Sequence, residues 1–506
     1  MLRIVETKYG SVRGIPAADP RITSFKGIPF AAPPVGENRW RAPQPLKPWE
    51  GVLDASRFAP ISMQSIPGLG TDIYCREWHV DPDIPMDEDC LYLNIWTGAK
   101  SADEKLPVLV WFFGGALQWG YPPEMEFDGE RIARRGVIVV SVNYRLNAFG
   151  FLAHPELTAS QPESPANFGS LDQQAGLKWV AENIAAFGGD PENITIAGQS
   201  AGGGSVLTQM TCPDNYGIIK KAVIMSAMIR NPYNGWGIGI PATMEQGEKQ
   251  GEEFFEFLGV KTLAEARALD AKYIRDKFDE FYNKTHKLFT NVIDNVICIG
   301  DPMMRVANNQ YANIPIMAGC TADEFPSVIE ASSREEFEAK AKEIFGDKAE
   351  TFLAFEEANR VSAAGYASTN GIEASAKCIF LKDEANGNGG KNYFYRFEPD
   401  IPGWDNPGTF HSVDLWFFFE TLAKCWRPFV GRHYDLARQM CNYFTNFIKT
   451  GDPNGDDITG EPMPKWESYG DKNRSEMLFT ANGPVSRQNE ESDYIKFMME
   501  HVSTFF

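Results

Sequence analysis

Short apolar segments that alternate with longer amphipathic ones limit how this chain can fold more than any other feature. Five segments have the length and apolar character of buried strands: residues 106–113, 137–142, 194–197, 222–225 and 314–318. Between the second and the third, "LDQQAGLKWVAENIAAF" repeats its apolar residues at helical spacing, and the Gly-Gly-Asp-Pro that follows predicts its end. Strands that alternate with helices predict an α/β protein with a large, mostly parallel central sheet covered by helices on both faces.

Residues 231–391 differ in character from the rest of the chain. Polar segments such as "ATMEQGEKQGEEFFEFL" and "SREEFEAKAKEIF" have the charge and apolar spacing of surface helices. We interpret them as helical additions around the sheet and not as a separate domain. Because large α/β sheets often exceed the usual domain size, residues 1–506 are predicted to form one domain.

The composition excludes several classes of partner. The formal net charge is -20, and such a surface repels phosphate backbones and anionic bilayers, so we expect no nucleic-acid partner. The longest apolar stretches, "LPVLVWFF" and "VIVVSV", are too short to span a bilayer, and the N-terminal "MLRIVETKYGSVRG" lacks the apolar core of a secretory signal. We therefore expect a cytoplasmic protein that does not associate with membranes.

The cysteines and histidines agree with this expectation. The 8 cysteines are scattered without a C-x-x-C pair, which favours free thiols in a reducing compartment. A disulfide between Cys75 and Cys90 stays open as an alternative. The 6 histidines do not cluster at ligand spacing, so we expect no metal ion, and no segment predicts a cofactor.

The segment "ITIAGQSAGGGS" runs from an apolar strand into glycines, with Ser200 in the middle. The pattern G-x-S-x-G is typical of a strand-to-helix elbow that exposes a serine hydroxyl as a nucleophile. A Gly-rich turn without chemistry is the alternative, because so short a pattern also arises by chance. Other parts of the chain have to decide between the two.

A nucleophilic serine needs a base, and the base needs an acid that orients it. In α/β-hydrolases the order along the chain is serine, acid, histidine. After Ser200, "IPIMAGCTADEF" ends a predicted strand in a turn with Asp323 and Glu324, where sheets of this kind gather their ligands. His411 in "NPGTFHSVDLWFFF" follows a turn, whereas the two later histidines lie in a charged helical segment and almost at the end of the chain. This order and placement favour His411 as the base over a purely structural histidine.

Backbone N–H groups are also needed to stabilise the negative charge that develops on the attacked carbonyl oxygen. One is expected from Ala201, the residue after the nucleophile, and the others from a Gly-rich loop after an early strand. "VLVWFFGGALQWG" places Gly114, Gly115 and Ala116 directly after such a strand. A plain turn is the alternative for this loop taken alone.

Longer segments resemble the type-B carboxylesterases, the cholinesterase-like family of α/β-hydrolases. The resemblance runs through nearly the whole chain and rests on "FKGIPFAAPPVGENRWRAPQP", "EDCLYLNIW", "NYRLNAFGFLAHPEL", "ANFGSLDQQAGLKWVAENIAAFGGDPENITIAGQSAGG" and "NFIKTGDPNG". Together these segments are far more specific than a five-residue pattern. The resemblance implies the α/β-hydrolase fold and a serine esterase.

The resemblance also implies roles for individual residues. Ser200 would be the nucleophile, Glu324 rather than Asp323 the acid, and His411 the base. The oxyanion donors would be the backbone N–H groups of Gly115, Ala116 and Ala201. The structural ion pairs of the family would fall on Arg39 with Glu88 and on Arg145 with Asp172.

The chain departs from the family pattern at three places. Phe113 stands where histidine or tyrosine is usual, and Ala116 replaces the third glycine, although alanine keeps the required N–H. Secreted relatives bridge the cysteine of the "EDC" segment to an upstream cysteine in a Cys-x-Gln pattern. Ser62 replaces that upstream cysteine, so Cys90 cannot form this bridge, which agrees with a cytoplasmic chain.

These residues predict a serine carboxylic-ester hydrolase that forms an acyl-enzyme on Ser200 from a small-molecule ester. Gln199, before the nucleophile, is neutral where a cation site would need a carboxylate, and Trp78 lies two residues off the position of the family's cation-binding ring. Neutral apolar or aryl esters are therefore the expected substrates, in a cleft lined by Leu117, Trp119, Gln199 and Trp416. An amidase, lactonase or peptidase with the same triad stays as an alternative, as does a non-catalytic adhesion or scaffold protein on the same fold.

Overall fold

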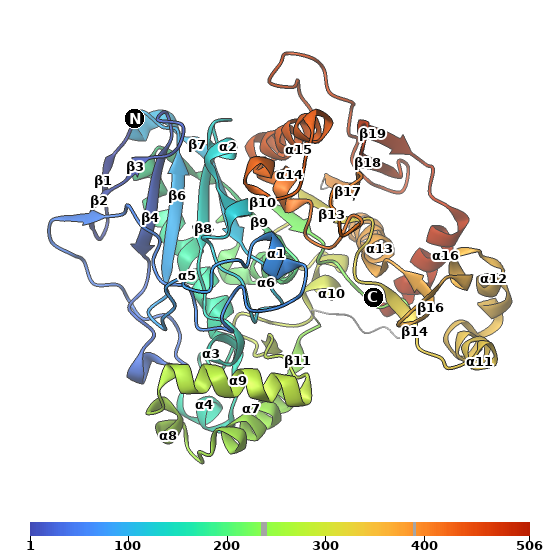
Figure 1. Cartoon of the computed structure of the whole chain (residues 1–506), viewed down its shortest axis with the longest axis horizontal. Coiled ribbons are helices and arrows are strands. Elements are labelled where there is room, and N and C mark those ends of the chain that lie inside the picture. The colour runs from blue at the N-terminus through green and yellow to red at the C-terminus, as the bar shows by residue number, and fades with distance from the viewer. Residues whose placement is uncertain (234–239, 388–390) are drawn as a thin grey trace.

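The computed structural model describes residues 1–233, 240–387 and 391–506. In this part of the chain one eleven-stranded sheet runs through the molecule (Figure 1), in the order β19-β18-β17-β13-β10-β9-β7-β8-β6-β4-β3. In chain order its strands are β3 (Ile15–Pro16), β4 (Thr23–Pro29), β6 (Tyr92–Thr97), β7 (Leu106–Phe112), β8 (Ile138–Val142), β9 (Gly189–Gln199), β10 (Ile219–Met225), β13 (Ile316–Thr321), β17 (Asn392–Glu398), β18 (Ser475–Thr480) and β19 (Gly483–Gln488).

The central strands of this sheet are parallel. From β18 to β8 every neighbouring pair is parallel. The pairings of β19 and of β6, β4 and β3, toward the two edges, are antiparallel. The predicted large, mostly parallel sheet of an α/β protein is confirmed.

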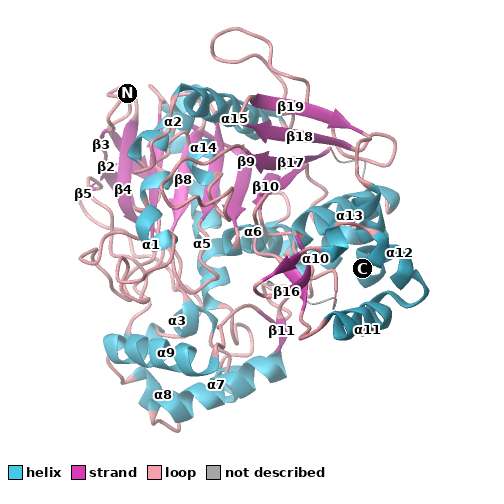
Figure 2. Cartoon of the chain, turned by 45° about the vertical axis from the view of Figure 1, so that its right-hand side comes forward, coloured by secondary structure: helices cyan, strands magenta, loops and turns pink. Residues whose placement is uncertain are grey.

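Alternate residues of the central strands enter two hydrophobic cores, one on each face of the sheet. Leu109 and Trp111 of β7 belong to one core, and Val108 and Val110 to the other. Since both faces are covered, these strands are apolar throughout. Figure 2 shows the covering helices on the two sides of the strands. The first core includes α2 (Glu130–Ala133), α14 (Leu415–Phe418) and α15 (Gly431–Thr450), and the second includes α5 (Phe168–Asn183), α6 (Ala201–Thr211), α10 (Pro302–Ala307), α13 (Gly371–Ala385) and α16 (Asp493–Val502).

Helices occur in the segment where sequence patterning predicted helical additions. One group, at the bottom of Figure 1 together with α4 (Pro155–Ser160), comprises α7 (Met244–Leu258), α8 (Leu263–Arg267) and α9 (Ala271–Thr285). Further along, α11 (Arg334–Phe345) and α12 (Ala349–Ala354) lie near the C-terminus. The remaining α-helices are α1 (Tyr74–Glu77) and α3 (Asn147–Phe151). The remaining strands are β1 (Ile4–Thr7), β2 (Gly10–Arg13), β5 (Val52–Asp54), β11 (Ala242–Thr243), β12 (Val292–Ile293), β14 (Ser327–Ile329), β15 (Val361–Ser362) and β16 (Gly365–Thr369).

The five predicted strands are present as β7, β8, β9, β10 and β13. β9 is longer than predicted: it begins at Gly189, which pairs with Leu106 before a shift in register. The predicted helix begins three residues early, at Phe168, and its last four residues form a 3₁₀ turn. It ends at Gly188, whose φ of +82° favours glycine. Apolar periodicity therefore located these elements, while long-range pairing set their ends.

Both ion pairs implied by the family resemblance are confirmed. Arg39 Nη2 lies 2.6 Å from a carboxylate oxygen of Glu88. Arg145 Nη2 lies 2.7 Å from Asp172, and both side chains are buried. The second pair joins the segment after β8 to α5, one of the helices that cover the sheet.

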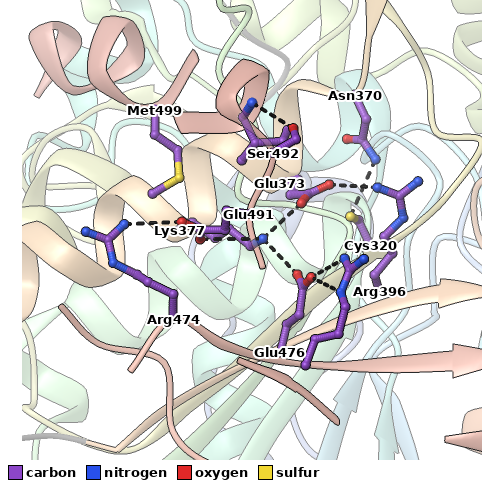
Figure 3. Close-up of polar contacts among 12 residues, drawn as sticks. Cys320, Asn370, Glu373, Lys377, Arg396, Arg474, Glu476, Glu491, Ser492 and Met499 are labelled. Carbon is purple, nitrogen blue, oxygen red and sulfur yellow. Dashed lines mark hydrogen bonds and ion pairs between the residues drawn. The ribbon is translucent and has the colours of Figure 1, made fainter. Parts of the chain in front are cut away.

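Lys377 of α13 lies in a buried group of charges (Figure 3). Its ammonium lies 2.9 Å from Glu373, 2.7 Å from Glu476 and 3.7 Å from Glu491, and its side chain is only 1% exposed. Each of these three carboxylates also forms an ion pair with an arginine: Glu373 with Arg396, Glu476 with Arg487, and Glu491 with Arg474. This group, which we call the Lys377 network, connects α13 to the last three strands of the sheet.

In the described part of the chain no helix is long and apolar enough to cross a membrane. No three His, Cys, Asp or Glu side chains of the described residues converge in a way that could hold a metal ion. All eight cysteines are free thiols, including Cys75 and Cys90.

Candidate active site

Ser200 lies at the turn between β9 and α6. Its φ of 56° and ψ of -127° fall in a region that residues other than glycine rarely adopt. The glycines of the pattern allow close packing around it. A Cβ on Gly198 would lie 2.3 Å from the carbonyl oxygen of Gly202, and a Cβ on Gly202 would lie 2.1 Å from that of Phe112. The local structure is therefore a strained strand-to-helix elbow, and Ser200 lines a cavity at its outer side.

Glu324 and His411 are brought together from the turn after β13 and the loop after β17. The imidazole Nδ1 of His411 is hydrogen-bonded to Oε2 of Glu324. The other carboxylate oxygen of Glu324 accepts the N–H of Thr321 at 3.1 Å and its hydroxyl at 3.0 Å. Both side chains are buried, so these contacts hold the carboxylate and the ring in one orientation.

The Glu324–His411 contact has a larger effect than burial on the pKa of both groups. Burial alone would raise the pKa of Glu324 and lower that of His411, because each would lose the hydration of its charged form. The facing partner acts in the opposite direction, so the pKa of Glu324 lies below its ordinary value and the pKa of His411 lies above it. The site therefore keeps Glu324 ionised and stabilises a protonated His411.

Asp323 has a different position from Glu324, although the two are adjacent in sequence. Its carboxylate accepts the N–H of Thr409 at 2.8 Å and the hydroxyl of Thr409 at 2.9 Å. Thr409 is two residues before His411, so Asp323 fastens the loop that carries the histidine. Of the two acidic residues of this turn, Glu324 is the one in contact with the imidazole.

The second ring nitrogen of His411 faces Gln199, the residue before Ser200. The carboxamide nitrogen of Gln199 lies 3.2 Å from Nε2 of His411. Because Nδ1 donates its proton toward Glu324, Nε2 is the acceptor of the neutral ring. Gln199, Ser200 and His411 all line the same cavity.

The Gly-rich loop after β7 forms another part of the cavity wall. Gly114, Gly115 and Ala116 line the cavity, and both Gly115 and Ala116 have positive φ, 103° and 56°. Ala201 is the first residue of α6, so its N–H has no partner within the helix. Among the described residues, no acceptor is hydrogen-bonded to the N–H of Gly115, Ala116 or Ala201. These donors remain free to bind an oxygen.

The cavity has a volume of about 710 Å³, which suits a small organic molecule. Of the four side chains expected to line it, Trp119 and Gln199 do so.

The expectation was wrong for Leu117 and Trp416, which are not part of the cavity lining. Leu117 is buried at a positive φ of 63°. Trp416 is fully buried, where its indole N–H points to Glu77 at 3.4 Å and its ring packs on Trp78. Both side chains belong to the hydrophobic core.

Several residues of the cavity wall were missed or left in doubt by sequence reasoning. Phe325, next to Glu324, is 49% exposed, and its ring centre lies 4.6 Å from that of His411. Trp78 lines the cavity despite its shifted place in the sequence, as do Glu124 and Glu126. Adjacency to Glu324 was a signal for Phe325. No sequence signal marked the two glutamates, because acidic residues are usually exposed.

The fold and this site together define an α/β-hydrolase: a mostly parallel sheet, a serine at a strand-to-helix elbow, and a histidine held by a carboxylate. The chain belongs to the carboxylesterase family, whose family model matches residues 2–497. It is an enzyme of the carboxylesterase class.

Two relatives with similar sequences are esterases. The para-nitrobenzyl esterase of Bacillus subtilis (strain 168) is 29% identical over 512 residues, which cover 97% of this chain and 98% of the relative. A cholinesterase of Mus musculus is 41% identical over 238 residues, which cover 46% of this chain and 38% of the relative.

Solved structures of similar proteins superpose along nearly the whole chain. A PNB esterase structure matches with a TM-score of 0.77 and 28% identity, covering 98% of this chain and 100% of the other. A carboxylesterase structure from Geobacillus stearothermophilus matches with a TM-score of 0.76 and 28% identity, covering 99% of this chain and 100% of the other.

Proposed function

We propose that this carboxylesterase uses Ser200, His411 and Glu324 as a catalytic triad to hydrolyse neutral apolar or aryl esters. The observation that carries the proposal is the shared cavity: the elbow serine and the Glu324-bound histidine line the same space. A serine in a strained elbow and a histidine oriented by a carboxylate are the two parts that this reaction requires.

In the acylation step, Nε2 of His411 takes the proton of Ser200 as Oγ attacks the ester carbonyl carbon. For this transfer the hydroxyl has to occupy the side of Nε2 that the Gln199 amide now faces at 3.2 Å. The N–H groups of Gly115, Ala116 and Ala201 would stabilise the oxyanion, since each lacks another partner among the described residues. Glu324 stabilises the imidazolium that forms, in line with the raised pKa of His411.

The tetrahedral intermediate then breaks its bond to the alcohol oxygen. His411 gives its proton to that oxygen, the alcohol leaves, and the acyl group stays on Ser200 as an ester. In deacylation His411 takes a proton from water as the water attacks the acyl carbonyl. The second tetrahedral intermediate releases the carboxylic acid, and the proton returns to Ser200.

The preference for uncharged esters rests on the centre of the cavity. Gln199, beside the nucleophile, carries no charge, and Phe325 and Trp119 add apolar surface next to the reacting groups. A trimethylammonium group would lose water there without a carboxylate beside the serine. We expect kcat/KM for an uncharged alkyl butyrate to exceed that for butyrylcholine at least tenfold. Equal or faster turnover of butyrylcholine would refute the preference.

An amidase with the same triad is the other candidate, and a matched pair of substrates separates the two. Initial rates would be compared for p-nitrophenyl butyrate and for the corresponding p-nitroanilide, with the same acyl chain. The proposal requires a much larger kcat/KM for the ester than the difference in leaving groups alone produces in water. An amide rate comparable to the ester rate would favour the amidase.

We also propose a cytoplasmic location. The free thiols of the eight cysteines and the serine at position 62 agree with a reducing compartment. Fractionation of the source cells, with the enzyme followed by activity, tests this part of the proposal.

A further inference from the structure

The Gly-rich loop after β7, residues 114–120, which we call the oxyanion loop, has an unusual backbone. Gly115, Ala116 and Leu117 follow one another with positive φ of 103°, 56° and 63°. Residues other than glycine rarely adopt such values, and a strained backbone of this kind persists only where its surroundings hold it. Contacts outside the backbone of Ala116 and Leu117 must therefore keep the loop in this shape.

The peptide between Gly115 and Ala116 is fixed by the loop itself. The carbonyl of Gly115 accepts the N–H of Gln118 at 2.9 Å and that of Trp119 at 3.0 Å. Because a trans peptide is planar, the N–H of Ala116 points in the direction opposite to this carbonyl. The carbonyl is turned into the loop, so the N–H is directed out of it, and Ala116 lines the cavity.

The next peptide, between Ala116 and Leu117, is fixed by the side chain of Gln118. The carboxamide nitrogen Nε2 of Gln118 donates to the carbonyl of Ala116 at 2.9 Å. Among the described residues, no other donor is hydrogen-bonded to this carbonyl. The orientations of the two peptides that flank Ala116 set its φ and ψ. The Gln118 carboxamide therefore holds one half of the strained conformation.

The same carboxamide is anchored on the backbone of Phe289, between α9 and β12. Its Nε2 donates to the carbonyl of Phe289 at 2.6 Å, and its Oε1 accepts the N–H of Phe289 at 3.4 Å. The ring of Phe289 packs on Phe254 of α7 and Phe278 of α9, with ring centres 5.2 and 6.1 Å apart. Gln118 has 0% exposure and is not among the described residues that line the cavity. It connects the oxyanion loop to the helical additions from outside the substrate cavity.

We propose that Gln118 is a positioning residue for ester hydrolysis: its carboxamide holds Ala116 in the conformation in which the N–H of Ala116 binds the oxyanion. This inference rests on the proposed function and extends it to a residue that does not touch the substrate. Without the carboxamide, the peptide after Ala116 is free to rotate and Ala116 can leave its positive φ. The aromatic contacts of Phe289 with α7 and α9 give the anchor its rigidity.

The test compares ligands with and without an oxyanion. Ser200 Oγ adds to the carbonyl carbon of butyl trifluoromethyl ketone, its proton passes to Nε2 of His411, and the carbonyl π electrons stay on the oxygen as an oxyanion. Butyl methyl ketone has the same chain but does not add appreciably, so it reports binding without the oxyanion. Both inhibition constants are measured against p-nitrophenyl butyrate, together with kcat/KM, in folded protein.

Gln118→Met keeps the size of the side chain and removes the carboxamide. Removing one oxyanion donor costs about 10²–10³-fold in kcat, so a displaced donor should lower kcat/KM at least about tenfold. The inhibition constant of butyl trifluoromethyl ketone should rise by the same factor, and that of butyl methyl ketone by less than about threefold. Gln118→Asn, one methylene shorter, cannot reach both carbonyls without moving the loop. It should show the same pattern with a smaller loss, and it carries the test if Gln118→Met does not fold.

Gln161→Met is the matched control. The carboxamide nitrogen of the buried Gln161 also donates to two carbonyls, those of Trp40 at 2.8 Å and Ser164 at 3.1 Å, but Gln161 is not part of the cavity lining. This variant should lose stability and keep kcat/KM and both inhibition constants. A loss of kcat/KM in Gln118→Met with unchanged affinity for butyl trifluoromethyl ketone, or with an equal loss for both ketones, would overturn the positioning role.

The two proposals fail in different ways. Turnover that survives Ser200→Ala would refute the proposed function, and this inference with it. Turnover that depends on Ser200 but is unchanged in both Gln118 variants would refute this inference alone.

Discussion

Replacement of Lys377 by methionine tests whether the Lys377 network stabilises the fold. Methionine has a similar length and fills the space, but it removes the cation that faces Glu373, Glu476 and Glu491. Removing one partner of a buried ion pair costs about 3–5 kcal/mol, because the other charge stays buried without compensation. Each of the three carboxylates keeps an arginine. We therefore expect Lys377→Met to lower the free energy of unfolding by about 3 kcal/mol, at the lower end of this range.

The pH dependence of this loss has a definite sign. Burial raises the pKa of Glu373, but Lys377 and Arg396 outweigh burial and hold it below the ordinary value of 4.5. A carboxyl group of this kind contributes stability above its unfolded pKa, and the contribution disappears as the pH falls through its folded pKa. The pKa of Lys377 is raised above the ordinary 10.5 of lysine, so its contribution to stability is fully present at pH values well below 10.5. The difference between wild type and Lys377→Met should therefore be complete at pH 7 and shrink below pH 4.5.

Urea denaturation at pH 7 and at pH 4, followed by tryptophan fluorescence and circular dichroism, measures both quantities. Lys496→Met is the matched control, because Lys496 is 55% exposed and pairs with an exposed aspartate at 3.3 Å. Such surface pairs contribute about 0–1 kcal/mol. A Lys377→Met protein as stable as the Lys496→Met control would refute the reasoning, since the network would then be no better than an apolar contact.

Four further predictions concern the site and the thiols. Ser200→Ala should lower kcat at least about 10⁴-fold in a folded protein, because triad members act as a unit; more than a tenth of the wild-type rate would exclude Ser200 as the nucleophile. In the wild type kcat/KM should rise with pH through an apparent pKa above the ordinary 6.5 of histidine, since only the neutral ring accepts a proton and Glu324 raises its pKa. Glu324→Gln should cut kcat strongly and move this limb to lower pH, whereas Asp323→Asn should change both little; the reverse ranking would move the acid by one residue. A thiol reagent applied to denatured, unreduced protein should titrate eight cysteines; six would indicate a disulfide, with Cys75–Cys90 the first pair to examine.

The sheet and the elbow were predictable because their causes are local. The apolar runs that became β7, β8, β9, β10 and β13 are apolar on both faces, as buried parallel strands must be. The glycines around Ser200 are required by contacts of the elbow itself, and Gly198 and Gly202 would clash with backbone oxygens if either carried a Cβ. The choice of Glu324 over Asp323 needed the family resemblance, since two adjacent acids in a turn look alike in sequence.

Sequence by itself thus determined the class of fold, the position of Ser200 and the order in which an acid and a histidine follow it. Only the tertiary structure decided which side chains that are distant in sequence are in contact. It turned Leu117 and Trp416 into the core, placed Phe325 on the His411 ring, and buried Glu126 without a basic partner. The physical reason is range: apolar periodicity and backbone requirements act over a few residues, whereas burial and charge compensation depend on groups hundreds of residues apart. His411 and Gln199, separated by 212 positions and 3.2 Å apart, are the clearest case.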